Sequence, residues 1–231
     1  MNREFLFGVL NAKLTELLTD NEYQMLKNLS RGQFLEYLFN ANVVPNKLSD
    51  FETASFEVLD ALEKEVFEYV GPDHWIYRYF FAKADNLVEH YNKVYESLLK
   101  NEELIENAVF ISKFHLIKNI SLMYRFNDQN ISVEKLQANL LLQKEISDEF
   151  LLKAYDLGKQ EISVLVKDLV ELTVEKADSV LEIEKLLDDY FHEIVSAYAY
   201  SSEVEHVLIY YIYRIMKQLE NIRAIYYLGG Y

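Results

Sequence analysis

The chain of 231 residues contains no cysteine, only two prolines and only six glycines. The lack of cysteine excludes disulfides, thiolate metal ligands and thiol nucleophiles, and it fits a reducing compartment. Proline and glycine supply most of the tight turns that sheet-containing folds require. Their scarcity, together with a hydrophobic content of 51%, predicts an all-α protein of long helices and short connections.

Three further signatures are missing. The sequence has no G-x-G-x-x-G or Walker-type phosphate loop, and none of its five histidines belongs to an H-E-x-x-H zinc motif. Its longest apolar run, 207–216, includes Arg214 and is about half as long as a bilayer-spanning helix. We therefore expect no bound cofactor and no membrane-spanning segment.

Positive charge is also scarce, since 38 acidic residues outnumber 23 lysines and arginines and give a formal net charge of −15. Nucleic acids and anionic lipids are usually bound through lysine and arginine, so this balance disfavours both as partners. We expect protein partners instead, with a basic contact face.

Helix boundaries are marked clearly in this sequence. A Ser or Thr followed three residues later by Glu forms a capping box, and four such pairs occur: Thr19 with Glu22, Ser49 with Glu52, Ser179 with Glu182, and Ser202 with Glu205. Glycines at 71, 158 and 229–230 mark helix ends. With the 3.6-residue periodicity, these signals predict helices at 3–17, 20–29, 31–40, 50–70, 74–100, 102–126, 133–142, 148–157, 159–172, 180–200 and 203–227.

The order of these segments suggests two related multi-helix units, 1–126 and 127–231. Each half holds short helices, then a capped helix rich in acids, then a long helix rich in aromatic residues. The polar stretch 127–130 is the predicted boundary.

The sequence leaves a metal site open as an interpretation, but it offers few candidate ligands for one. Glu203 and His206 lie three residues apart, as in di-iron helix bundles, and Asp189 with His192 is the nearest second pair. Such bundles need two more glutamates, and acids in the first turn of a helix commonly stabilise its dipole. We therefore predict no metal site and no catalytic residue.

Acid runs and tyrosines supply further candidates. The runs are interpreted as solvated helix faces rather than catalytic carboxylates, namely Glu63, Glu65 and Glu68, and Asp188, Asp189 and Glu193. The chain has 18 tyrosines, a residue that tolerates both water and a protein contact. Most should lie in the core, and the hypothetical partner contacts are Tyr77, Tyr213 and Tyr226.

Several segments resemble the family of central-stalk socket subunits of V-type ATPases, designated C in prokaryotes and d in eukaryotes. The likeness covers the opening segments 5–14 and 17–23, the short helix 34–38, the helix start Glu182–Asp188, and the closing segment Leu219–Arg223. The resemblance implies an all-helical fold of repeated units, here a shortened two-unit member. It also implies structural roles for five residues: Glu184, Asp188, Glu220, Asn221 and Arg223.

The function implied by this resemblance is mechanical. Family members are non-catalytic central-stalk subunits that link the cytoplasmic axle to the membrane ring and support proton or sodium transport. The implied partners are other V-type ATPase subunits, and the implied location is the cytoplasmic side of the membrane. A helical adaptor or assembly factor is the alternative, and a carboxylate-bridged metal enzyme is a remote one. Arg223 is expected to pair within the protein.

Overall fold

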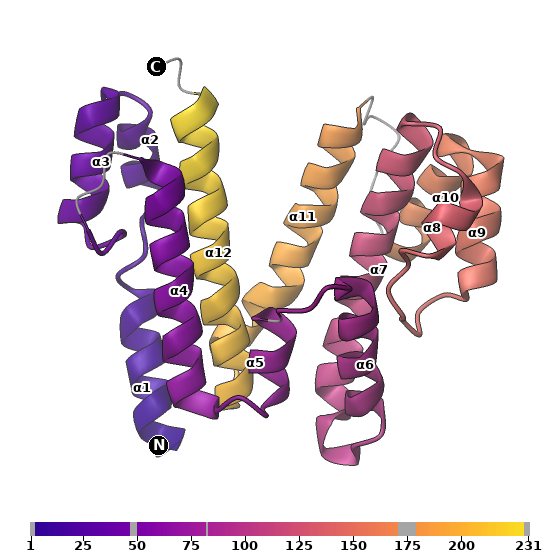
Figure 1. Ribbon diagram of the computed structural model, residues 1–231, viewed down its shortest axis with the longest axis horizontal. Coiled ribbons are helices and arrows are strands. Elements are labelled where there is room, and N and C mark those ends of the chain that lie inside the picture. Colours follow the sequence, from indigo (N-terminus) through magenta and orange to yellow (C-terminus); the bar gives the residue numbers. More distant parts are fainter. Residues whose placement is uncertain (1–2, 47–49, 82, 171–178, 229–231) are drawn as a thin grey trace. The chain divides into compact units, whose positions relative to one another are not determined.

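The computed structural model describes residues 3–46, 50–81, 83–170 and 179–228, and every regular element within them is a helix (Figure 1). This confirms the predicted all-α class. None of the helices in these ranges is long and apolar enough to cross a membrane. The helices are α1 (Arg3–Leu14), α2 (Asp20–Leu26), α3 (Arg31–Asn40), α4 (Phe51–Val70), α5 (Trp75–Phe80), α6 (Leu87–Leu99), η1 (Glu102–Leu104), α7 (Ile105–Asp128), α8 (Val133–Gln137), α9 (Asp148–Leu157), α10 (Lys159–Val170), α11 (Val180–Ser196), η3 (Ala197–Tyr200) and α12 (Val204–Leu228).

The helices form two compact units that differ from the predicted halves. Unit 1 combines Met1–Tyr77 with Val195–Tyr231, and unit 2 is Arg78–Ile194. The two ends of the chain fold together because α12 packs against α1, α2 and α4 (Figure 1). The polar stretch 127–130 lies inside unit 2, where α7 ends and Asn130 adopts a left-handed φ of 53°. It marks the end of a helix rather than a boundary between units.

The core of unit 1 is built from both ends of the chain. The ring of Tyr226 lies 5.6 Å from that of Phe34 and 5.5 Å from that of Phe51. Each fully buried apolar side chain of this kind contributes roughly 1.5–3 kcal/mol to folding. The cluster consists of Leu18, Leu26, Phe34, Leu38, Val43, Val44, Phe51, Ala54, Leu219, Ile222 and Tyr226.

Helix α7 is the centre of unit 2, with α6, α8 and α10 packed against it. Twelve of its 24 residues are buried. Phe191 of α11 adds to this core, with its ring 4.7 Å from Phe114 and 5.8 Å from Phe110. A helix buried over so much of its surface explains why α7 shows little of the one-sided apolar pattern of a surface helix.

Two of the predicted capping boxes are confirmed. Thr19 and Glu22 exchange both hydrogen bonds at the start of α2, and Ser179 and Glu182 do so before α11. Ser49, predicted to cap α4, lies outside the described residues. The N-cap of α4 is Asp50, whose carboxylate accepts a hydrogen bond from the Thr53 amide at 2.9 Å.

Two predicted helices differ most in extent from those of the structure. The single helix 74–100 is interrupted between α5 and α6, where the Asn86 side chain accepts a hydrogen bond from the Glu89 amide and starts a new helix. The helix predicted at 133–142 ends at Gln137. In the segment that follows, side chains of α6 and α7 bind the backbone of residues 141, 142 and 144.

Helix α12 is buried on all sides over 207–212. The buried side chains there are Val207, Leu208, Ile209, Tyr210, Tyr211 and Ile212. A helix that is apolar all round belongs in an interior. The apolar run that was too short to cross a membrane is therefore a core helix.

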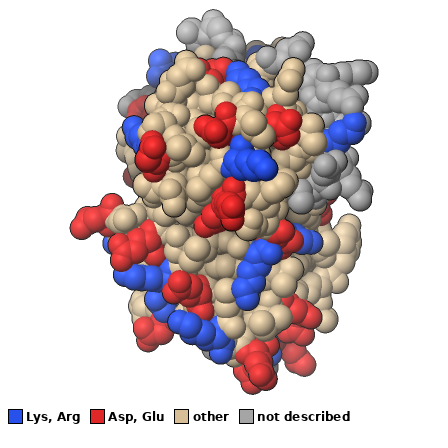
Figure 2. Space-filling model, turned by 90° about the vertical axis from the view of Figure 1, so that its right-hand side faces the viewer, with Lys and Arg blue, Asp and Glu red and all other residues tan. Residues whose placement is uncertain are grey.

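At least one face of the molecule carries charged side chains of both signs. On the face shown in Figure 2, which carries the helices at the right of Figure 1, basic and acidic side chains alternate over a largely uncharged background.

Candidate functional site

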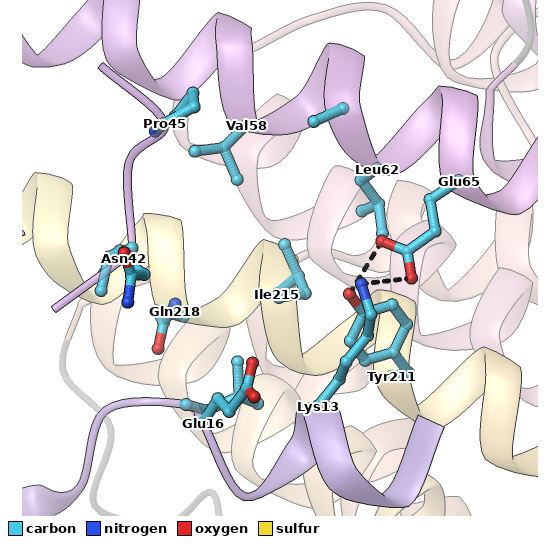
Figure 3. Close-up of a pocket in the computed structure, with 13 residues that line it drawn as sticks. Lys13, Glu16, Asn42, Pro45, Val58, Leu62, Glu65, Tyr211, Ile215 and Gln218 are labelled. Atoms are coloured by element: carbon cyan, nitrogen blue, oxygen red, sulfur yellow. Dashed lines mark hydrogen bonds and ion pairs between the residues drawn. The ribbon is translucent and has the colours of Figure 1, made fainter. Parts of the chain in front are cut away.

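A cavity of about 220 Å³ opens in unit 1 between α1, α4, α12 and the turn after α3 (Figure 3). That turn contains Asn42, which adopts a left-handed φ of 55°. The lining combines aliphatic and polar side chains in similar numbers, with Lys13, Glu65 and Tyr211 at one end and Asn42 and Gln218 at the other. The lining residues are Lys13, Glu16, Leu17, Asn42, Val43, Pro45, Val58, Ala61, Leu62, Glu65, Tyr211, Ile215 and Gln218.

Glu65 is the polar centre of one end of this cavity. Its carboxylate lies 2.8 Å from the Lys13 ammonium and accepts a hydrogen bond from the Tyr211 hydroxyl at 3.2 Å (Figure 3). It also accepts a hydrogen bond from the Tyr69 hydroxyl. Burial raises the pKa of Tyr211, and the Glu65 charge raises it further, so this phenol stays protonated and acts as a donor. The group joins α1, α4 and α12, which is a structural task.

Gln218 performs a similar task at the other end. Its side-chain oxygen accepts a hydrogen bond from the Leu18 amide at 2.8 Å, and its side chain is buried. This bond satisfies a backbone amide just after α1 that has no partner within its own helix. Lys13, Glu65, Tyr211 and Gln218 in this cavity therefore already take part in contacts that hold the fold together.

Unit 2 contains a second polar arrangement, in which helix side chains bind the backbone of segment 140–144. Asn119 donates to the Leu141 carbonyl and accepts from the Leu141 amide, both at 2.8 Å. Asn92 accepts from the Leu142 amide at 2.7 Å, and Ser112 accepts from the Lys144 amide at 2.9 Å. These side chains form the hydrogen bonds that a neighbouring β-strand would otherwise provide, because buried backbone groups need hydrogen-bond partners.

His115 completes this arrangement inside unit 2, where it is fully buried. Its Nδ1 lies 2.6 Å from the Leu142 carbonyl and its Nε2 lies 2.8 Å from the Tyr79 hydroxyl. A carbonyl can only accept, so Nδ1 carries the proton and Nε2 accepts from Tyr79. Burial lowers the pKa of His115 to about 4, although the bond to Leu142 opposes this shift. The imidazole is therefore neutral at physiological pH.

The sequence did not identify these residues as a group. Asn92 and Asn119 lie inside helices, where asparagine is a poor helix former, and this was the one available signal. Their partners are 22 to 50 residues away in sequence. Only the fold brings them together.

The candidate metal ligands have other neighbours. His206 stacks on Tyr198 with ring centroids 4.2 Å apart, and its Nδ1 lies 2.8 Å from the Ser201 hydroxyl. The backbone amide of Glu203 donates to the same hydroxyl at 3.1 Å. Among the residues that the structure describes, no three His, Asp or Glu side chains lie close enough together to hold a metal ion.

Glu205 is engaged within unit 1 in the same way. Its carboxylate, predicted to close a capping box with Ser202, lies 3.3 Å from His74 and 3.5 Å from the indole nitrogen of Trp75. Hydrogen bonding to His74 lowers the pKa of Glu205, whereas its burial opposes the shift. It joins α12 to the start of α5.

Comparison with known proteins found no match. No protein-family model, curated protein or solved structure matches it.

Of the three tyrosines predicted to contact a partner, one is clearly a core residue. Tyr226 is 5% exposed, and the Arg31 side chain lies over its ring and donates to its hydroxyl. Burial in unit 1 takes it away from the surface. Tyr77 is half-buried and donates to Glu63 at 2.9 Å, and Tyr213 is also half-buried.

Two of the family-motif residues make contacts between helices. Arg223 of α12 donates two hydrogen bonds to Glu52 of α4, at 3.2 and 2.9 Å, so the expected pairing within the protein is confirmed. Glu184 of α11 accepts from Arg125 and, at 3.1 Å, from Ser121, both on α7. Each contact joins helices that are far apart in the sequence.

The other motif residues have more local surroundings. Glu220 is exposed and pairs with Lys217 one turn away at 3.3 Å. Asn221 forms a side-chain hydrogen bond with Tyr23. Asp188 is half-buried on α11.

Proposed function

We propose that this chain is a non-catalytic helical subunit that binds other proteins, and that it works in the rotor of a V-type ATPase. In this role it links the cytoplasmic axle to the membrane ring and supports proton or sodium transport without making or breaking a bond. The proposal assigns it to the cytoplasmic side of the membrane, where protein partners hold it. It rests on the resemblance of five segments, 5–14, 17–23, 34–38, 182–188 and 219–223, to the socket subunits of that rotor.

The pairing of Arg223 with Glu52 is the observation that supports this role best. Arg223 belongs to the closing segment that carries the most specific part of the resemblance, and it joins the last helix of unit 1 to α4 through two parallel hydrogen bonds. A subunit that transmits torque needs helices that resist sliding past each other. A densely packed core provides most of this resistance, and the half-exposed pair adds a modest contribution.

Capture of partners tests the proposal. The full chain is tagged in its source cell, membranes are solubilised gently, and the co-purified proteins are identified and quantified by mass spectrometry. Ring and axle subunits of a V-type ATPase in stoichiometric amounts are the expected result. Recovery of unrelated soluble proteins alone, from cells whose ATPase is intact, contradicts the rotor role and favours a helical adaptor or assembly factor.

Metal analysis tests the remote alternative of a carboxylate-bridged metal enzyme. The full chain is purified without chelator, then incubated with iron or manganese and desalted. We expect no stoichiometric metal in either preparation. One or two ions per chain that are lost in a Glu203→Gln, His206→Gln variant would contradict the non-catalytic assignment.

A further inference from the structure

The outer face of α4 carries two phenylalanines where charged residues are expected. Phe56 and Phe67 are 70% and 46% exposed. They are eleven residues apart, which is close to three full helical turns, so they lie on one face about 16 Å from each other. The core side of the same helix is opposite and carries the buried residues Phe51, Ala54, Ser55, Leu62 and Val66.

We call this face the α4 outer stripe and define it by Glu52, Phe56, Asp60, Glu63 and Phe67. Acidic and aromatic side chains are interspersed along it, at the positions that 3.6-residue periodicity brings into line. An amphipathic surface helix normally presents polar residues on this side. The two phenylalanines thus need an explanation other than the core of unit 1.

Neighbouring tyrosines extend both ends of the stripe. The ring of Tyr77 meets that of Phe67 edge-on, with centroids 5.6 Å apart, while its hydroxyl donates to Glu63. At the other end, Tyr227 is 58% exposed and donates to Glu52 at 3.0 Å. These contacts hold carboxylates in a fixed orientation beside aromatic rings, and such an arrangement is suited to binding a partner.

The charge of α4 is not explained by the stability of the helix. The helix contains six acidic residues and one lysine, Lys64, and its last turn has no basic residue. The C-terminal end of a helix carries a partial negative charge, so acids such as Glu65 and Glu68 are unfavourable there. Lys13 compensates Glu65, the exposed Lys64 pairs with Asp60 and Arg223 pairs with Glu52, but the six acids of α4 still outnumber these three cations. The arrangement as a whole favours an external cation.

We propose that the α4 outer stripe binds a protein segment that carries lysine or arginine beside apolar side chains. This inference rests on the proposed function and specifies the chemistry of one partner. The cationic groups pair with Asp60 and Glu63 and lie over the phenylalanine rings, and the apolar groups cover Phe56 and Phe67. The contact extends over about three helical turns, which fits a helix lying along α4.

Charge decides between this occupant and the others. A second copy of the chain that docks through the same stripe meets like charge and is repelled, and an anionic lipid surface or a nucleic acid is repelled for the same reason. The face in Figure 2 mixes both signs and offers no comparable field. A basic protein segment is therefore the complementary partner.

A designed peptide tests this inference with the full chain. The probe is a fluorescent helical peptide of lysine and leucine with its leucines along one face, and its counterpart has glutamate in place of lysine. We expect the lysine peptide to bind and the glutamate peptide not to bind in fluorescence anisotropy. The double variant Phe56→Ser, Phe67→Ser should weaken binding of the lysine peptide at least tenfold, because it removes the apolar and cation–π contacts.

The matched control is Phe5→Ser, which removes another strongly exposed phenylalanine, 62% exposed on α1. It should change the affinity less than twofold, and circular dichroism should show the same melting temperature for all variants. Equal affinity of the double variant and the wild type overturns the inference, as does an equal loss in the control.

Partner capture from the source cell separates this inference from the proposed function. The double variant should lose a partner that the wild type retains, and that partner should carry a basic amphipathic segment. Retention of all partners by the double variant overturns the stripe but leaves the proposed function standing. Failure of the wild type to capture ATPase subunits contradicts the proposed function, while the peptide result still decides whether the stripe recognises basic segments.

Discussion

The buried neutral state of His115 leads to a measurable dependence of stability on pH. The imidazole is enclosed in unit 2, accepts a hydrogen bond from the Tyr79 hydroxyl and donates one to the Leu142 carbonyl. A protonated ring would have two donors, and its charge would face a phenol hydroxyl and a carbonyl, neither of which is anionic. Burial accordingly lowers the pKa of His115 to about 4, from 6.5 for an exposed histidine.

The sign and size of the effect follow from this shift. Between pH 6.5 and 4 the His115 imidazole binds a proton in the unfolded chain but stays neutral in the folded chain. The contribution of His115 to the free energy of unfolding is therefore complete above pH 6.5 and is lost as the pH falls towards 4. Each pH unit in that window costs about 1.4 kcal/mol at most. The loss from His115 should be about 2 kcal/mol at pH 5.0 and about 3 kcal/mol near pH 4.

Urea unfolding of the wild type and of His115→Gln, followed by circular dichroism, measures this loss. Glutamine does not titrate and can still donate to the Leu142 carbonyl. The other four histidines and all carboxylates are common to both proteins, so their contributions cancel in the comparison. Between pH 7.5 and 5.0 the wild type should lose about 2 kcal/mol more than the variant, although the variant starts from a lower stability.

Equal losses in the two proteins would refute the reasoning. An imidazole NMR signal of His115 that titrates near pH 6.5 in the folded protein would refute it independently. Either result would mean that the ring reaches water, and that its bonds to Tyr79 and Leu142 do not persist in solution.

Three further substitutions test other parts of the structure. Arg223→Ala should lower the free energy of unfolding by about 0.5–1 kcal/mol, seen as a lower melting temperature, because it removes a half-exposed pair with Glu52; Lys217→Ala, which removes a pair within one helix, is the control. Asn119→Ala should cost about 2–4 kcal/mol in urea unfolding, because it leaves the amide and carbonyl of Leu141 without their partner; a cost below about 1 kcal/mol would show that water replaces the side chain. Ser55→Ala should stabilise the protein by about 1 kcal/mol in the same assay, because the buried Ser55 hydroxyl has no hydrogen-bond partner in the part of the chain that the structure describes. A destabilised variant would contradict this.

The sequence predicted the helices well where a chemical signal marked their ends. The boundaries of 31–40 and 148–157 were correct at both ends, and Thr19 and Ser179 form the capping boxes expected of them. It failed where apolar periodicity ran through a cap, as at Asn86, or where side chains of other helices bind the segment that follows a helix. Caps act within four residues, so they can be read locally.

The candidate surfaces divide in the same way. The acid-rich and aromatic composition of α4 is visible in the sequence, but the exposure of Phe56 and Phe67 on its outer side required the structure. Tyr226, one of the predicted contact residues, instead became part of the core of unit 1. A tyrosine pattern cannot separate these outcomes, because the ring suits either environment.

Composition, charge and capping chemistry thus determined an all-α chain with acidic faces and most of its helix starts. The tertiary structure decided that the last helix joins the first four in unit 1, that α12 is buried on every side over 207–212, and that Asn92, Asn119 and His115 hold segment 140–144. The physical reason is the distance along the sequence over which each interaction acts. Helix periodicity and capping act over a few residues, whereas burial and the pairing of buried polar groups depend on residues that only the folded chain brings together.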